Sequence, residues 1–184
     1  MFQIGDGVVH PVHGVGIITD ISSKDISGEP YKYYVINLIT INMRLLVPVD
    51  NAEKIGLYRA LGKPEAEKML SVVSAPAEPL PQDYRKRQAC VASALRSGNV
   101  LRTAEAFRDL AWRRHRKRLS AGDSRLLERL KRFLSGQLAL AQDMDLDEAS
   151  TLIESTVENT LWQTTVSDGV EGTDGAEISG PSSQ

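Results

Sequence analysis

The spacing of apolar residues changes from a strand pattern to a helix pattern near residue 58, and this change constrains the fold more than any other feature. Before that point, short runs rich in Val, Ile and Tyr are separated by Gly, Pro and Ser, as is typical of β-strands. The segment SGEP at 27–30 predicts a turn, and Gly14 and Gly16 mark places where a strand must bend or bulge. Four or five such strands in about 50 residues predict a small, strongly curved β-barrel.

After residue 58, apolar residues recur with the period of amphipathic helices, and capping residues mark where the helices begin and end. Residues 163–184 are rich in Gly, Ser and Asp and nearly lack large apolar side chains, a composition typical of disorder. We therefore expect an α+β chain with a β-barrel at 1–58, an all-α domain at 59–162 and a disordered acidic tail at 163–184. The predicted helices run over about 64–73, 82–96, 100–116, 121–143 and from Asp145 or Asp147 to Trp162.

Charge is sorted along the chain into three blocks that the total of −2 conceals. Residues 1–84 have a net charge of −3, residues 85–132 have 15 Lys or Arg against four acids, and residues 133–184 have ten acids and no Lys or Arg. A middle block with a net charge of +11 has the electrostatics of a nucleic-acid-binding module. The acidic C-terminal third either makes the chain more soluble or screens the basic block and so reduces nonspecific DNA binding.

Several classes of function lack their sequence signature in this chain. Cys90 is the only cysteine, which excludes an intramolecular disulfide and a cysteine-rich zinc site, and its small apolar neighbours predict that it is buried. His10 and His13 are spaced like metal ligands but have no acidic or thiol partner nearby, so neither a metal nor a cofactor is predicted. The chain has no Gly-rich phosphate loop, zinc-protease motif or nucleophile elbow, so we do not expect an enzyme.

The ends and apolar runs of the chain give no sign of a membrane or of export. The N-terminus lacks the basic and apolar stretches of a signal peptide, and no apolar run reaches the roughly 20 residues that span a bilayer. We therefore expect a soluble, cytoplasmic protein, and we expect it to be a monomer.

The predicted helix at 100–116 has one apolar face, and Trp112 lies outside it. At about 100° per residue, Val100, Ala104, Phe107 and Ala111 fall within about 60° of one another, whereas Trp112 lies roughly 130° from their centre, among arginines. Two interpretations remain open. The indole either packs over a neighbouring helix with its rim in water, or it is exposed and stacks on, or wedges between, bases.

The strongest cluster of positive charge surrounds this tryptophan, and it contains no acid from Arg113 to Arg118. Such a run is either a solvated helix face or a surface that binds phosphates, and the absence of the opposite sign favours phosphates. It specifies no base sequence, because phosphate contacts position a protein without reading bases. The candidate contacts are Arg113, Arg114, Arg116, Lys117 and Arg118, with Arg85, Lys86 and Arg87 on the preceding helix.

Three segments taken together resemble the CarD/CdnL family of bacterial transcription regulators: IGDGVVHPVHGVGIITDI, MRLLVPVDNAEKIGLY and FRDLAWRRHRKRLSAGDSRLLERLKRFLSGQLALA. The segments occur in the order found in that family, and the resemblance covers roughly residues 1–158. It implies a Tudor-like N-terminal barrel that binds the β subunit of RNA polymerase. It also implies a helical domain that touches promoter DNA at the upstream edge of the melted bubble.

The resemblance also implies roles for particular residues. The strand that matches the polymerase-binding face makes Met43, Arg44 and Pro48 candidate contacts, and the family's basic patch maps to Arg108 and to Arg113–Arg118. Many members place a wedge tryptophan in this region, which props open the upstream fork. In the family that tryptophan directly follows an Asp-Leu pair, a place that Ala111 takes in this chain. Because one residue turns a helix by about 100°, Trp112 fits the wedge less closely than the arginines fit the DNA surface.

The resulting hypothesis is a transcription regulator that docks on RNA polymerase through its barrel and stabilises the open complex through DNA phosphates. Tethering raises the local concentration of DNA, so a weak DNA affinity suffices. One rival is a self-sufficient nucleic-acid-binding protein whose barrel touches nucleic acid, which the negative charge of residues 1–84 disfavours. Another is a structural adaptor whose basic helices meet an acidic protein.

Overall fold

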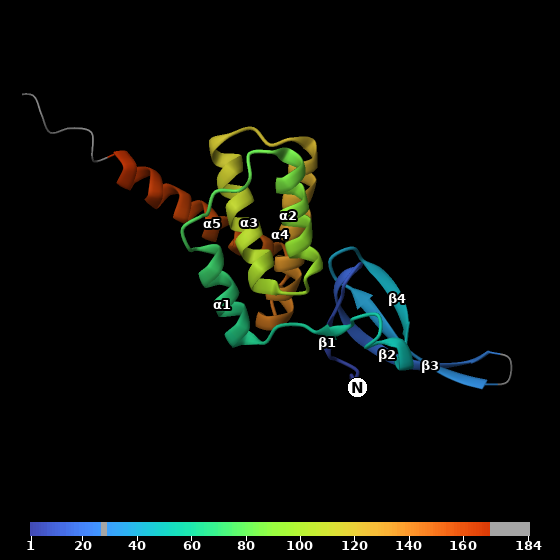
Figure 1. The fold of residues 1–184 in the computed structure, drawn as a ribbon. Helices are drawn as coiled ribbons and strands as arrows, with labels where there is room; N and C mark the ends of the chain where they lie inside the picture. The colour runs from blue at the N-terminus through green and yellow to red at the C-terminus, as the bar shows by residue number, and fades with distance from the viewer. Residues whose placement is uncertain (27–28, 170–184) are drawn as a thin grey trace, which may run out of the picture.

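The structure is a computed structural model that describes residues 1–26 and 29–169, except for the side chains of residues 24–30 and 161–169. A five-stranded antiparallel sheet forms the N-terminal part, and a bundle of helices α1 to α5 follows it (Figure 1). The predicted α+β class, with strands followed by helices, is therefore confirmed. Most of the predicted tail, residues 170–184, lies outside the described residues.

The strands form one sheet in the order β4-β3-β2-β1-β5. Their bounds are Gly7–His10 for β1, Gly14–Ile26 for β2, Glu29–Leu38 for β3, Met43–Pro48 for β4 and Tyr58–Arg59 for β5, with a short 3-10 helix at Val49–Asn51. Among the described strands, β4 and β5 form the two edges, so the sheet is not closed into the predicted barrel. The reason is that β5 is only two residues long and pairs with β1, which leaves no strand to reach β4.

The sheet curves because β2 contains a close strand approach and a bulge. A Cβ atom at Gly16 would lie 2.7 Å from the carbonyl oxygen of Asn37 in β3, so no larger residue fits there. The register between β2 and β3 then shifts between Ile18 and Asp20, which places the bulge just after the predicted glycine pair. The curved face encloses a core cluster of Val8, Ile18, Tyr34, Ile36, Leu38, Val47, Ala52 and Leu57.

The helices begin and end close to the predicted positions. Their bounds are Lys63–Val73 for α1, Tyr84–Arg96 for α2, Val100–Arg116 for α3, Ala121–Gln142 for α4 and Leu146–Gly169 for α5. The predicted caps are confirmed, because the Asn99 and Ser120 side chains each accept a backbone N–H bond, from Arg102 and Asp123, at 3.1 Å. Helix α5 continues past Trp162 to Gly169, so the prediction that helix ends near 162 was wrong.

Helix α3 shares the centre of the helical core with α4, because both helices pack against each of the others. It therefore buries a wider face than the predicted stripe, and that face includes Thr103, Leu110 and the charged pair Arg108 and Asp109. An amphipathic helix with one neighbour needs a single apolar stripe, whereas a central helix is enclosed on several sides.

Helix α2 buries one face only, and Cys90 does not lie on it. The buried positions of α2 are Arg87, Val91 and Ala94, spaced four and three residues apart. Cys90 is exposed, so the prediction that it is buried was wrong. Its neighbour Val91 lies on the buried face, whereas one residue turns a helix by about 100° and carries Cys90 away from it.

The sheet and the helices are packed directly against each other through α4. A Cβ atom at Gly136 of α4 would lie 2.7 Å from Cγ2 of Thr40 and 3.0 Å from Cβ of Val15. The neighbouring Gln137 is fully buried, and its side-chain oxygen accepts the backbone N–H of Leu61 at 3.0 Å. These contacts fix the junction between the two parts of the chain.

Candidate functional site

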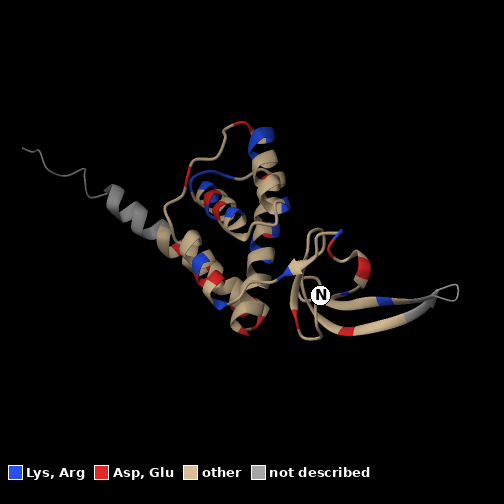
Figure 2. Ribbon diagram, turned by 60° about the horizontal axis from the view of Figure 1, so that its bottom comes forward, with Lys and Arg blue, Asp and Glu red and all other residues tan. Residues whose placement is uncertain are grey.

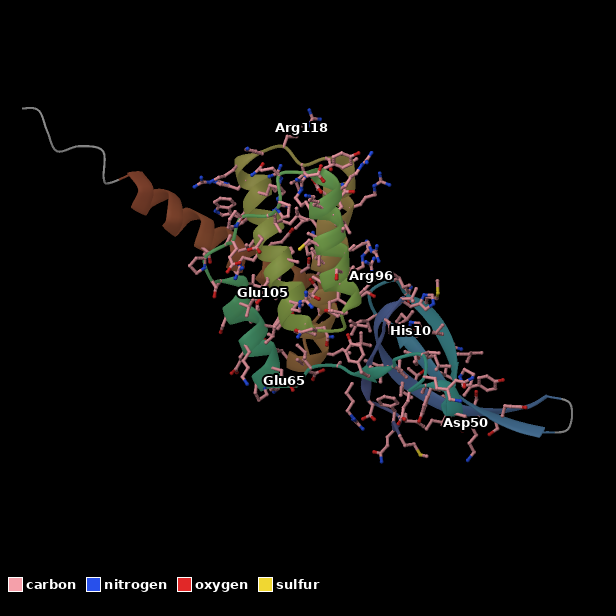
Figure 3. All side chains as sticks on the ribbon, viewed as in Figure 1. His10, Asp50, Glu65, Arg96, Glu105 and Arg118 are labelled. Atoms are coloured by element: carbon pink, nitrogen blue, oxygen red, sulfur yellow. The ribbon has the colours of Figure 1, made fainter. Side chains whose placement is uncertain are left out.

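Exposed cations gather at the end of the helical part that lies away from the sheet, where Arg118 is labelled (Figure 3). We call this surface the basic end. It combines the start of α2 with the end of α3 and the loop that follows it. These two segments lie side by side, because the Gln88 amide of α2 donates a hydrogen bond to Ser120 Oγ at 3.4 Å. The basic end consists of the exposed residues Arg85, Lys86, Arg114, Arg116, Lys117 and Arg118.

Stabilisation of the helix ends explains only part of the positive charge at the basic end. Three arginines and His115 occupy the last turn of α3, where the partial negative charge of a helix C-terminus stabilises each cation by about 0.3–1 kcal/mol. Arg85 and Lys86 instead lie in the first turn of α2, which contains no acid. There the helix dipole opposes positive charge. The grouping of cations at the basic end is therefore not a by-product of helix capping.

Arg87 is the first predicted DNA contact that the structure removes from the surface. It is only 3 % exposed and forms a buried ion pair, with its Nη2 2.7 Å from Oδ2 of Asp123. Its Nη1 also donates to the carbonyl oxygens of Pro81 and Gln82, each at 2.9 Å. A guanidinium with all these partners joins the connector between α1 and α2, residues 74–83, to α2 and α4, and it does not lie at the surface.

The carboxylate of Asp123 is held in its charged form by this pair. Burial raises its pKa, but the hydrogen bonds from Arg87 and Ser120 and the charge of Arg87 outweigh burial and hold the pKa below its ordinary value of 3.8. The pair therefore exists at neutral pH as a salt bridge inside the helical part.

Arg108 is the second predicted DNA contact that is buried. Its Nη2 lies 2.8 Å from Oδ1 of Asp109, and the same carboxylate oxygen accepts the backbone N–H of Glu78 at 2.9 Å. Arg108 and Asp109 together hold the connector between α1 and α2 against α3, so the guanidinium lies inside the helical part and not at its surface. The Arg-Asp-Leu motif is thus structural in this chain.

Trp112 has features of both interpretations of the sequence. It is half-buried and shares a small crevice with Val73 of α1 and Val157 of α5, so the indole packs on neighbouring helices. One face of the ring is covered by the Arg116 guanidinium, whose Cζ lies 4.4 Å from the ring centroid. Stacking on a base through that face would require Arg116 to move.

Arg113 also differs from its neighbours at the basic end. It is half-buried, and its Nε is buried without a hydrogen-bond partner among the described residues. It offers less of its guanidinium to a ligand than the exposed Arg114 and Arg118 do, so we leave it out of the basic end.

Sequence reasoning did not single out three arginines on α4. Arg125, Arg129 and Arg132 are exposed and are spaced four and three residues apart, so they form one stripe along the helix. Figure 2 shows more positive residues along the helices than along the strands. The helical spacing itself was the signal that could have found this stripe, which leads from the basic end towards the junction with the sheet.

The predicted polymerase-binding residues lie on the edge strand β4. Met43 and Leu46 are 49 % and 44 % exposed, Arg44 is exposed and Pro48 is half-buried. Among the described strands, β4 pairs only with β3, so its other edge carries unpaired backbone groups. An edge with exposed apolar side chains is a ready template for a strand of another protein.

The described residues offer no candidate metal centre. Among the side chains that the structure describes, those of residues 1–23 and 31–160, no group of three or more His, Cys, Asp or Glu is placed to hold a metal ion. Nδ1 of His10 instead accepts the backbone N–H groups of Val12 and His13, at 3.1 and 3.3 Å. In the part of the chain that the structure describes, no helix is both long and apolar enough to cross a bilayer.

Comparison with known proteins identifies both parts of the chain. Residues 2–59 match the CarD-like/TRCF RID domain, and residues 68–154 match the CarD C-terminal domain. Over 138 residues the chain is 27% identical to a protein of Bacillus subtilis (strain 168) named "Putative transcription factor YdeB". That match covers 75% of this chain and 90% of the relative.

The open sheet with a free edge and the helices with their exposed cations define a two-part protein. The two matches together cover most of the sequence, so the chain belongs to the CarD family of transcription factors. The predicted resemblance is therefore confirmed. The N-terminal match is to an RNA polymerase-interacting domain, which makes RNA polymerase the implied partner.

Proposed function

We propose that this protein docks on the β subunit of RNA polymerase through β4 and contacts promoter DNA through the basic end. The DNA contact lies at the upstream edge of the melted bubble, and it stabilises the open complex. Such a protein performs no chemistry and needs no cofactor. The proposal rests above all on the pairing of two separate surfaces, a free strand edge on the sheet and a cluster of exposed cations on the helices.

The polymerase contact is proposed to form by addition of a strand to β4. Unpaired backbone groups along that edge would supply hydrogen bonds, and the exposed Met43 and Leu46 would supply apolar contact. Arg44, between them, would select an acidic position on the partner. The connection from Ile39 to Asn42 is continuous with this surface, and it adds the 40 % exposed Ile41.

The DNA contact is proposed to be electrostatic and independent of base sequence. Six exposed cations at the basic end can each neutralise one phosphate, which gives a slope of about −5 for log affinity against log salt. Free DNA is then bound weakly at physiological salt. Docking on the polymerase makes the DNA contact effectively intramolecular, so the weak affinity becomes sufficient.

Trp112 is proposed to act first of all through Arg116. The Arg116 guanidinium lies over the indole, with its Cζ 4.4 Å from the ring centroid, and this contact holds it in place at the basic end. A wedge between bases, as the family resemblance implies, requires Arg116 to leave the ring and bind a phosphate. Both roles place the indole next to the DNA, and both are lost when the ring is removed.

Binding to purified RNA polymerase tests the docking surface. We expect Arg44→Glu to weaken binding at least about tenfold, because it reverses the charge on β4. Lys54→Glu makes the same charge change on an exposed residue outside β4, so it is the matched control. Equal binding by the two variants would contradict the assignment of β4.

A further inference from the structure

A second positively charged surface lies at the junction of the sheet and the helices, away from the basic end. Here a cleft of about 430 Å³ opens between the turn that follows β1, the C-terminal end of α2 and the middle of α4. Figure 3 labels His10 and Arg96 on the two sides of this junction. We call it the junction cleft. Its size is that of a small-ligand site.

The junction cleft contains three arginines and no acid. Arg96 comes from the last turn of α2, and Arg129 and Arg132 come from the stripe on α4. Among the described residues, none of these three side chains has a hydrogen bond or ion pair. Burial also raises the pKa of Tyr58, which lines the cleft, to about 12, so its hydroxyl adds no negative charge.

This arrangement is unusual for a merely solvated surface. Solvated helix faces mix signs, because like charges brought together repel one another. The acids nearest to the α4 arginines are engaged elsewhere, because Glu128 and Glu154 pair with Lys131. Three arginines around one cleft with no ion pair among the described residues have the electrostatic signature of an anion site.

His10 adds a neutral hydrogen-bond donor to the cleft wall. Because its Nδ1 accepts the backbone N–H groups of Val12 and His13, the ring proton must be on Nε2. Burial, and then the charge of His13, lower the pKa of His10, which favours this neutral form. The Nε2–H group is therefore available to an acceptor oxygen.

The walls of the cleft are rigidly joined. Gly136 lies one turn after Arg132, where a Cβ would touch Thr40 and Val15 of the sheet part. Next to it, Gln137 accepts the N–H of Leu61 at 3.0 Å. A site whose walls are fixed before binding spends less free energy on ordering when a ligand arrives.

We propose that the junction cleft binds a phosphate group, held by the guanidinium groups of Arg96, Arg129 and Arg132 and by Nε2–H of His10. Guanidinium groups suit this role because they can bind two phosphate oxygens at once. The phosphate belongs either to the DNA backbone, reached along the α4 stripe, or to a free phosphorylated compound. The inference does not depend on the polymerase contact or on the basic end.

The test uses the full chain, with inorganic pyrophosphate as one probe and a short DNA duplex as the other. The cleft variant is Arg96→Gln/Arg132→Gln, and the matched control is Lys54→Gln/Arg102→Gln, which removes two positive charges from exposed residues outside the cleft. Thermal unfolding of both variants should match that of the wild-type protein, because the substituted arginines have no partners among the described residues.

Two results would support the site, and they identify the source of the phosphate. If calorimetry shows that pyrophosphate binding is weakened at least about tenfold in the cleft variant but not in the control, the phosphate is that of a free phosphorylated compound. If pyrophosphate does not bind but the salt dependence of DNA binding falls by about two phosphate contacts in the cleft variant alone, the phosphate is that of DNA. Cleft and control variants that behave alike with both probes would overturn the proposal.

Discussion

Replacing Arg87 should destabilise the helical part while leaving the DNA surface chemically intact. Arg87 belongs to the basic block of the sequence, yet its side chain is buried against Asp123. Arg87→Met keeps most of the aliphatic bulk and removes only the charged head. The carboxylate of Asp123 is then buried without its partner, and two carbonyl groups, of Pro81 and Gln82, lose their donor.

The size of the effect follows from these contacts. Removal of one member of a buried ion pair costs about 3–5 kcal/mol, because the remaining charge is left uncompensated. For a chain of this size, each kcal/mol lowers the unfolding temperature by about 2–4 °C, so we expect a fall of roughly 6–20 °C. Arg87→Met/Asp123→Leu removes both charges and should be less destabilised than Arg87→Met alone.

Thermal unfolding followed by circular dichroism measures this effect, and Arg85→Met supplies the control. Arg85 lies two residues earlier on the exposed side of α2, so its replacement should leave the unfolding temperature nearly unchanged and should weaken DNA binding. If Arg87→Met unfolds at the wild-type temperature and loses DNA affinity as Arg85→Met does, the structural role given to Arg87 is refuted.

Three further predictions concern acid, the junction and the indole. The pKa of Asp123 is lowered in the folded state, so its contribution to stability is complete above the ordinary value of 3.8 and is lost as the pH falls through the folded value. Urea unfolding at a series of acidic pH values should show this loss, and Asp123→Asn should remove it. Gly136→Val should lower the free energy of unfolding by about 1–3 kcal/mol, because a Cβ there meets Thr40 and Val15. Gly5→Asn is the control, because Gly5 is exposed and asparagine adopts a positive φ more readily than most residues, so this change should cost less in the same urea assay. Trp112→Ala and Arg116→Gln should weaken DNA binding by amounts that do not add in the double variant, because the two side chains act as one unit; additive losses in a binding titration would separate them.

The helices could be predicted from the sequence because their limits are set locally. Asn99 and Ser120 cap α3 and α4 through hydrogen bonds to residues three positions ahead, so no distant part of the chain is needed to place them. The strands were predictable for a similar reason, through alternation and β-branched residues. Closure of the sheet was not, because it depends on the two-residue strand β5 and its choice of partner.

The sequence predicted that the site is positively charged, but it did not predict which arginines lie at the surface. Arg87 is in step with the buried Val91 and Ala94, so helical spacing carried a signal that the run of cations concealed. Arg108 gave no such signal, because its burial depends on a connector that folds back over α3. Net charge therefore located the basic block, whereas pairing with Asp109 and Asp123 decided which arginines remained on the surface.

The lifetime of the open complex tests the proposed function most directly. The comparison is among wild-type protein, Arg44→Glu and Arg114→Gln/Arg118→Gln, each added to RNA polymerase on the same promoter. We predict that wild-type protein lengthens the lifetime, that Arg44→Glu fails because it does not dock, and that the basic-end variant docks but fails to lengthen it. An unchanged lifetime with wild-type protein, or a full effect from the basic-end variant, would contradict the account.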